Sequence, residues 1–423
     1  MARSTDLKTA VSAEPTPAST FVAAAPLLLL ILVDAIGFAM LTPLLASALA
    51  DGADAGISQG LSTTQRHLVY GIATGLYPIM TFFGAPILGQ LSDRLGRKTI
   101  LLVCATGIAA SYVVISAAFA WGSIALLMAG RMIGGLTAAS QAVSLAAVVD
   151  VCRPARKDFW LSMGLLCSSL GFVLGPALSG FLSDTAILPW FNLMTPLYAT
   201  AAVAALNVVM LALLFHDSRQ RLASSPVSLI SGFKSFGAAF AKPGPLRDVS
   251  WVFLLQELAW GAYFYFIPVF LLDHYGVSGK DASYFMSVMG VGFCVSFAAA
   301  MPLLTKYFST RAITSGSLIA TAILIAMSAF APSMLVQWIL ILPISVAVAV
   351  SYGALIILFT DTATEDTKGE VMGITAAINS LSFGSVSFLG GWLEGLSAGA
   401  PIYVALALMT MSWLVFSFQK RPK

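Results

Sequence analysis

The chain has 423 residues, of which 58% are hydrophobic and only 10% are charged. A soluble domain carries about 25% charged residues, so this composition excludes a protein whose whole surface faces water. The formal net charge of +3 becomes informative only when the Lys and Arg residues are assigned to particular loops. The four cysteines show no paired spacing, which argues against a disulfide framework or a metal site.

Twelve long apolar segments predict an all-α membrane protein with 12 transmembrane helices. Residues 1–20 are polar and are expected to form a tail, and the apolar segment from Phe21 is too long for the core of a signal peptide. Each crossing needs about 20 apolar residues, and only helices or closed barrels cross lipid. The segments are centred on roughly residues 36, 79, 109, 137, 170, 205, 261, 293, 322, 347, 382 and 409.

A basic connection rich in Ser, Gly and Pro, residues 217–248, divides these segments into two groups of six. We therefore expect one six-helix bundle over 21–216 and a second over 249–423. Sequence echoes between the halves, such as "GQLSDRLGRKTIL" and "PLLTKYFSTRAIT" at matching positions, support two related bundles. This layout is expected of one class of transporters, in which the substrate binds at the midplane between the halves.

The distribution of basic residues predicts the orientation. All but three of the 22 Lys and Arg residues fall in the two tails or in the connections after helices 2, 4, 6, 8 and 10. The exceptions are Arg66 and Lys280 on the other side and Arg131 inside a helix. Both termini are therefore expected to be cytoplasmic.

The connection after helix 2, "GQLSDRLGRK", is the most densely charged stretch between two apolar segments. Asp93 and Arg97 are four residues apart and can pair if the turn is helical. Gly89 allows a neighbouring helix to approach closely, and Asp93 can lie against the positive N-terminal end of another helix. We favour a conformational latch over a plain positive anchor, and its residues are Gly89, Asp93, Arg94, Gly96 and Arg97.

Four motifs carry a family resemblance over nearly the whole chain. "GQLSDRLGRK" resembles the helix 2–3 loop signature of the major facilitator superfamily, and "LVDAIGFAMLTPLLA" resembles the helix 1 signature of its twelve-helix drug/proton antiporters. "GRMIGGLTAAS" resembles the Arg-containing motif of helix 4. "GFVLGPALSG" resembles the helix 5 motif of exporters, although generic packing would also explain its small residues Gly171, Gly175, Pro176 and Gly180.

Within that superfamily the chain is most similar to the tetracycline-exporter branch. The resemblance implies alternating access, with Asp93 closing against the start of helix 11 near Gly369. The chain departs from that branch at Ser111, where the exporters carry an acid, and in helices 8 and 9, which lack their His and Asp. The departures argue against tetracycline as the substrate.

Asp34 is a charged residue about 13 residues into helix 1, near the membrane midplane. A charge there costs at least ~2.5 kcal/mol and usually marks a transport pathway or proton relay. Arg131 is the basic residue deep in a helix and is the expected counter-charge. Two interpretations stay open: proton or substrate coupling by Asp34, or a permanent ion pair that joins helices 1 and 4.

Glu257 is the second acid within an apolar helix, on helix 7, which matches helix 1 in the other half. It either faces the central cavity or lies near the cytoplasmic entrance. An aromatic cavity with one or two acids suits cations. Candidate lining residues, for each of which packing is the alternative role, are Tyr77, Gln256, Trp260, Tyr263, Tyr352, Asn379 and Phe383.

No catalytic constellation or phosphate-binding loop is present, so an enzyme and an ATP-driven pump are excluded. We expect a proton-coupled antiporter that exports small amphipathic or cationic compounds, with no cofactor and the proton gradient as its energy source. The expected setting is the bacterial inner membrane, with lipid, protons and substrate as partners, no nucleic acid, and a monomeric state. The alternatives are proton-coupled transport of a metabolite or siderophore in either direction, and a non-transporting membrane receptor.

Overall fold

The computed structural model describes residues 17–49, 56–217, 230–364, 367–397 and 399–419. The predicted tail up to residue 16 and residues 218–229 of the predicted linker lie outside the described residues. Glu365 and Asp366 also lie outside the described residues. Within the described residues, twelve helical segments are long and apolar enough to cross a membrane, which confirms the predicted number.

The helices fall into two groups of six membrane spans. The first bundle contains α1 (Pro17–Leu49), α2 (Thr63–Leu95), α3 (Arg97–Trp121), α4 (Ile124–Leu136), α5 (Ser140–Val151), α6 (Lys157–Leu182) and α7 (Thr195–Leu214). The second contains α9 (Pro245–Tyr275), α10 (Gly279–Val295), α11 (Met301–Tyr307), α12 (Thr310–Ala329), α13 (Met334–Asp361), α14 (Lys368–Leu396) and α15 (Ala400–Phe418). The short helix α8 (Ser231–Ala241) lies between the bundles in sequence.

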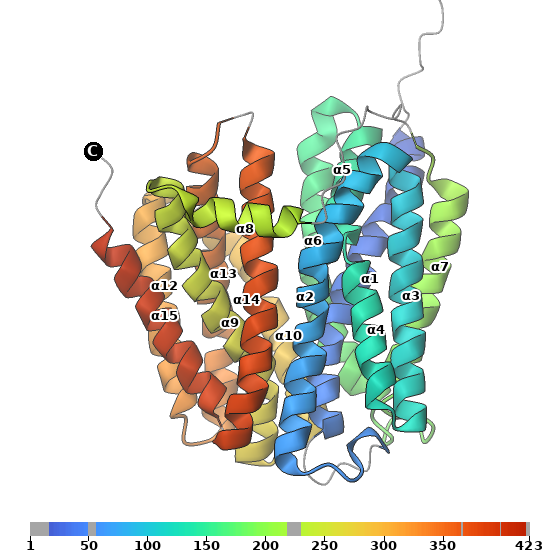
Figure 1. Ribbon diagram of the computed structural model, residues 1–423, viewed down its shortest axis with the longest axis vertical. Helices are drawn as coiled ribbons and strands as arrows, with labels where there is room; N and C mark the ends of the chain where they lie inside the picture. Colours follow the sequence, from blue (N-terminus) through green and yellow to red (C-terminus); the bar gives the residue numbers. More distant parts are fainter. Residues whose placement is uncertain (1–16, 50–55, 218–229, 365–366, 398, 420–423) are drawn as a thin grey trace, which may run out of the picture.

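The two bundles stand side by side, and α8 runs across one end of the molecule (Figure 1). We call this the basic end, because the Arg97, Arg156 and Arg311 connections lie there, and the other the opposite end. The bundles meet mainly along two helix pairs, α2 with α14 and α6 with α10. Each pair joins one helix from each bundle, so movement between the bundles must change both contacts.

The α2–α14 pair is closely packed near the opposite end. A Cβ atom on Gly71 would lie 2.7 Å from the Cα of Gly391, and one on Gly75 would lie 2.8 Å from the carbonyl oxygen of Gly384. Distances this short leave no room for a side chain, so glycine is required for the backbones to approach so closely.

The same interface separates toward the basic end. Among the described residues, no heavy atom lies within 4 Å of a Cβ position built on Gly89 of α2 or Gly369 of α14. The expected close approach of a helix at Gly89 is therefore not present in this conformation. The bundles are joined at the opposite end and apart at the basic end.

The fourth membrane span is broken into α4 and α5 by a turn over residues 137–139. Two glycines precede the turn, and both are tightly enclosed. A Cβ atom on Gly134 would lie 2.8 Å from Ser111 Oγ, and one on Gly135 would lie 2.4 Å from the Tyr77 carbonyl oxygen. The break starts a new helix, α5, in the middle of the span.

Candidate functional site

Asp34 lies in the middle of α1 and is only half-buried, although neighbouring helices surround it. The Tyr77 hydroxyl of α2 donates to its Oδ1 at 3.1 Å. The Ser140 hydroxyl donates to its Oδ2 at 2.6 Å. Ser140 is the first residue of α5, so the break in the fourth span delivers this donor and a helix N-terminus to the carboxylate.

Arg131 does not form the expected ion pair with Asp34 in the described part of the chain. Its guanidinium donates instead to the carbonyl oxygens of Ala73 at 2.7 Å and Thr74 at 3.3 Å. The Thr74 carbonyl needs an outside donor because Pro78, four residues later, has no N–H. The prediction of a direct counter-charge is therefore wrong, because two backbone carbonyl oxygens of α2 bind the arginine instead.

Tyr77 connects the two charged groups. The Arg131 guanidinium lies over its ring, 4.9 Å from the ring centroid, while its hydroxyl bonds Asp34. A change in charge or position at Asp34 therefore acts on Arg131 through one aromatic side chain. The neighbouring Ser111 donates to the Gly130 carbonyl oxygen at 2.9 Å and joins α3 to α4.

Glu257 is the corresponding acid of the second bundle, in α9, and it is 1% exposed. The side-chain amide of Asn379 in α14 donates a short hydrogen bond to its Oε2. Its Oε1 is buried and has no hydrogen-bond partner among the described residues. Glu257 is thus buried inside the bundle, and no basic side chain pairs with it among the described residues.

The predicted lining residues divide by exposure. Tyr77, Tyr352 and Asn379 are half-buried, whereas Trp260 and Phe383 are nearly buried. Gln256 and Tyr263 are fully buried, and the Tyr263 and Ser328 hydroxyls lie 3.1 Å apart. These two side chains do not line open space in this conformation.

An aromatic layer crosses the bundle interface next to Asp34. Phe38 of α1 stacks on Phe264 of α9, with ring centroids 5.9 Å apart. Phe172 of α6 contacts both rings and also Phe293 of α10. Aromatic contacts of this kind stabilise by about 0.5–1.5 kcal/mol each beyond their buried area. The layer joins the two bundles through their aromatic rings, and sequence analysis missed Phe38, Phe172 and Phe264.

The helix 5 motif lies in α6 and packs as expected of small residues. A Cβ atom on Gly171 would lie 2.3 Å from Ala35 Cβ, and one on Gly175 would lie 2.5 Å from the Ile36 carbonyl oxygen. Gly180 instead faces α10 of the other bundle, and Pro176 is buried in the same helix. The motif therefore holds α6 against the part of α1 that carries Asp34.

The expected latch pair is present, but among the described residues it bonds only side chains of the first bundle. Arg97 Nη1 lies 3.3 Å from Asp93 Oδ1, and Arg97 Nε lies 3.0 Å from Asp150 Oδ2 at the end of α5. Gly96 has φ +97°, which lets the chain turn sharply between α2 and α3. Arg94, the other basic residue of the latch motif, lies in the last turn of α2. Asp150 was not predicted, because only the fold brings it to Arg97.

Lys98, the residue after Arg97, also has defined partners. Its ammonium donates to the Ala212 carbonyl oxygen at 2.7 Å, and its backbone N–H faces both carboxylate oxygens of Asp217 at 3.2 Å. These bonds tie the start of α3 to the end of α7.

Charged groups join the bundles at the opposite end, where sequence analysis predicted few. Lys280 of α10 lies 2.9 Å from Asp184, which follows α6. His67 Nε2 of α2 lies 3.3 Å from Asp273 Oδ2 of α9. Glu394 of α14 is 3% exposed at the same end. The signal in the sequence that could have indicated these contacts is the presence of charged residues at helix ends on the side of the membrane that carries few of them.

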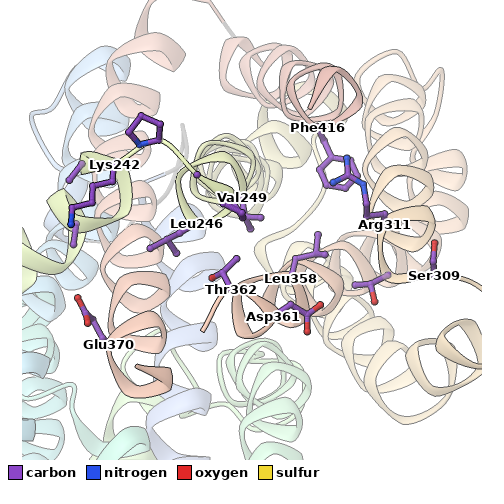
Figure 2. Close-up of a pocket in the computed structure, with 16 residues that line it drawn as sticks. Lys242, Leu246, Val249, Ser309, Arg311, Leu358, Asp361, Thr362, Glu370 and Phe416 are labelled. Carbon is purple, nitrogen blue, oxygen red and sulfur yellow. The ribbon is translucent and has the colours of Figure 1, made fainter. Parts of the chain in front are cut away.

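A separate cavity of about 940 Å³ opens in the second bundle at the basic end (Figure 2). It lies between the α8–α9 turn and the ends of α12, α13 and α15, and it contains charges of both signs, including Lys242, Arg311, Asp361 and Glu370. Asp361 and Glu370 are both exposed to solvent. This cavity contains neither Asp34 nor Glu257.

Comparison with known sequences gives consistent matches. The chain is 25% identical over 354 residues to the tetracycline resistance protein, class C, of Escherichia coli, which covers 82% of this chain and 84% of that protein. It is 32% identical over 196 residues to the class H protein of Pasteurella multocida, covering 46% of this chain and 44% of the relative. The human major facilitator superfamily domain-containing protein 10 is 33% identical over 141 residues, covering 32% and 30%.

Solved structures show the same fold. The human organic anion transporter MFSD10 superposes with a TM-score of 0.68 at 20% identity. The match covers 95% of this chain and 100% of that protein. A D-xylose-proton symporter superposes with a TM-score of 0.74 at 16% identity, covering 93% and 97%. The model of the Major Facilitator Superfamily matches residues 27–387, across both bundles. This multi-pass membrane protein belongs to the Major Facilitator Superfamily.

Proposed function

We propose that this transporter is a proton-coupled antiporter that exports small amphipathic or cationic compounds. The observation that carries the proposal is the environment of Asp34. Two hydroxyls bind the carboxylate, and no ion pair neutralises it among the described residues. A permanent structural ion pair, the alternative role, would need a basic partner that Arg131 does not supply. An acid of this kind inside a membrane protein is expected to bind protons or cationic ligands.

Glu257 supports the same proposal from the second bundle. Its described polar partner is the neutral amide of Asn379. Asp34 and Glu257 thus offer one acid in each bundle, near the aromatic side chains Phe38 and Trp260. Aromatic faces attract cations, so a cationic substrate and protons would compete for the same negative charge.

Alternating access would use the two ends differently. With the bundles apart at the basic end, Asp34 would release its proton there as substrate binds. Closure of that end would bring Asp93 to the start of α14, and opening of the opposite end would release substrate and reload the proton. Coupling requires only that protonation stabilise the two conformations differently. The proton gradient would supply the energy, with the bacterial inner membrane as the setting and a monomer as the working unit.

Arg131 favours a second candidate, proton-coupled transport of organic anions or anionic metabolites. Its guanidinium is 2% exposed and has carbonyl and aromatic partners but no carboxylate partner in the described chain. A buried cation of this kind would attract an anionic substrate if the helices around it moved apart. One protein of the same fold is a human organic anion transporter, which agrees with this alternative.

Reconstituted protein with an internal pH dye tests both candidates. Lipophilic cations and small organic anions would be added to wild type, to Asp34→Asn and to Asp158→Asn, which removes an exposed acid in the first turn of α6. We expect cations to evoke proton flux in the direction opposite to their own in wild type and Asp158→Asn, and not in Asp34→Asn. Flux evoked by anions alone would favour the second candidate, and flux in the same direction as substrate would favour symport.

A further inference from the structure

Three titratable side chains meet at the opposite end, where α2 of the first bundle crosses α9 and α14 of the second. His67 Nε2 of α2 lies 3.3 Å from Asp273 Oδ2 of α9. Glu394 of α14 lies within electrostatic range of both. The histidine belongs to one bundle and the two acids to the other, so this cluster exists only while the bundles are joined here.

Glu394 is buried in the interface between the bundles and is not exposed on the surface. Its side chain is 3% exposed, and its Oε1 accepts a hydrogen bond from the Gly399 backbone N–H at 2.9 Å. Its Oε2 is buried and has no hydrogen-bond partner in the described residues. A buried carboxylate oxygen without a donor costs free energy, and a bound proton removes both that cost and the repulsion from Asp273.

The backbones around the cluster leave little room for partial opening. A Cβ atom on Gly391 would lie 2.6 Å from the His67 carbonyl oxygen, and one on Gly395 would lie 2.9 Å from Thr64 Cγ2. Separation of α2 from α14 would therefore have two simultaneous effects. It would break the His67–Asp273 contact, and it would admit water to Glu394.

We propose that His67, Asp273 and Glu394 form a proton-binding gate whose protonated form holds the bundles together at the opposite end. The proposal deepens the proposed proton coupling and rests on it. His67 forms an ion pair with Asp273 only when its ring carries both protons. In water, histidine and glutamate lose their protons near pH 6.5 and 4.3, so an opened gate at pH 7 holds fewer protons than the closed one.

The gate would give the transport cycle a direction. Protons that arrive from the opposite side would close the interface behind them and favour the present conformation, in which the basic end is apart. Opening toward the opposite side would require these protons to leave. External acidity would thus act on the same conformational equilibrium that Asp34 controls from the interior.

Other charged groups near the gate supply controls. His274 neighbours Asp273, but its ring stacks on Phe270 with centroids 5.0 Å apart. Arg66 precedes His67, and its Nε donates to the Leu61 carbonyl oxygen at 3.1 Å. The Asp184–Lys280 pair joins the bundles at the same end through α6 and α10. His274→Gln is the control for His67→Gln, because it removes another histidine, at this end of α9.

The test is a pH titration of the distance across the opposite end. Spin labels would be attached through Gln59→Cys in the first bundle and Ser333→Cys in the second, both in exposed connections, after the four native cysteines are replaced. Measurements in lipid nanodiscs from pH 5.5 to 8.5 would use an Asp34→Asn, Glu257→Gln background, which removes the interior acids. We expect the ratio of open to closed protein to rise with pH, by up to tenfold per pH unit for each proton released.

Single substitutions then assign the protons. His67→Gln and Glu394→Gln should each reduce the slope of that titration, and Glu394→Gln should also favour the closed form because it mimics the protonated acid. His274→Gln should keep the slope, and Asp184→Asn should favour opening throughout the range from pH 5.5 to 8.5 without changing the slope. If Glu394→Gln fails to fold, His67→Gln alone decides the result.

A slope unchanged in both gate variants would overturn the gate. That result would leave the proposed function standing, provided that substrate still evokes proton flux in wild type. Absence of any such flux, together with a pH-dependent gate, would instead reject the proposed antiport and keep the gate.

Discussion

The Ser140 hydroxyl donates to Asp34 Oδ2 at 2.6 Å, although 106 residues separate the two side chains in the sequence. This bond exists because the fourth span breaks and restarts at Ser140, so that a helix N-terminus and a hydroxyl both face the acid. The break therefore belongs to the site as much as the acid does.

Ser140→Ala should slow proton release from Asp34. A hydrogen bond to a charged group contributes about 1.5–3 kcal/mol, so its loss favours the protonated acid. We expect coupled flux in proteoliposomes to fall at least about tenfold, since 1.4 kcal/mol corresponds to a factor of ten. Ser144→Ala is the matched control, because Ser144 lies one turn later in α5 and its Oγ bonds no described residue. Equal flux in the two variants would show that the Ser140 bond has no role.

Gly175→Ala should destabilise the first bundle. Its Cβ atom would lie 2.5 Å from the Ile36 carbonyl oxygen, so α6 would have to move away from α1. Overpacking of this kind typically costs about 1–3 kcal/mol. Thermal unfolding in detergent measures the effect against Gly316→Ala, where no described heavy atom lies within 4 Å of the new Cβ. Similar unfolding temperatures for the two variants would contradict the close packing.

Asp150→Asn and Asp93→Asn should separate stability from conformational switching. The Asp150 side chain is 12% exposed and pairs with Arg97, whereas Asp93 is 57% exposed. Exposed ion pairs contribute about 0–1 kcal/mol, and removal of one member of a buried pair costs more. We expect Asp150→Asn to lower the unfolding temperature more than Asp93→Asn does.

Asp93→Asn should instead act on closure of the basic end. Labels across that end should report a larger open fraction, with transport reduced, because the Asp93 carboxylate would reach α14 only when the two helices approach each other. An unchanged open fraction would contradict the latch.

Closure of the opposite end should also depend on Asp184 in a defined pH window. The hydrogen bond from the Lys280 ammonium, with that from the Ala186 N–H, lowers the pKa of Asp184 below its ordinary value of 3.8. The stabilisation is therefore present above about pH 4 and is lost as pH falls through the lowered pKa. Asp184→Asn should open more than wild type at pH 7, and the difference should vanish below that pKa. A difference that instead disappeared between pH 8 and 6 would exclude Asp184 as its source.

The sequence predicted the architecture well, because membrane spans and basic loops depend on composition over long windows. The twelve spans, the Asp93–Arg97 pair and the small-residue packing of Gly171 and Gly175 all follow from local spacing. The partner of Arg131 could not be predicted in the same way. Two backbone carbonyl oxygens of α2 accept hydrogen bonds from its guanidinium, and one of them has no helical donor because of Pro78. Only the fold shows that these carbonyls lie within reach of Arg131.

The charged contacts between the bundles were missed for a related reason. His67 and Asp273 are 206 residues apart, and each alone resembles an ordinary polar residue at a helix end. Glu394 lies in an apolar helix near its end, where an acid usually reaches water. Only the crossing of α2 with α14 buries it.

The central claim is that Asp34 couples substrate movement to protons rather than holding helices together. Once a substrate is known, the most direct measurement compares two fluxes of Asp34→Asn in the same proteoliposomes. These are the exchange of labelled for unlabelled substrate without a gradient and the uptake driven by a pH gradient. We predict that exchange persists while gradient-driven uptake falls to background. Gradient-driven uptake at the wild-type rate in Asp34→Asn would contradict the account.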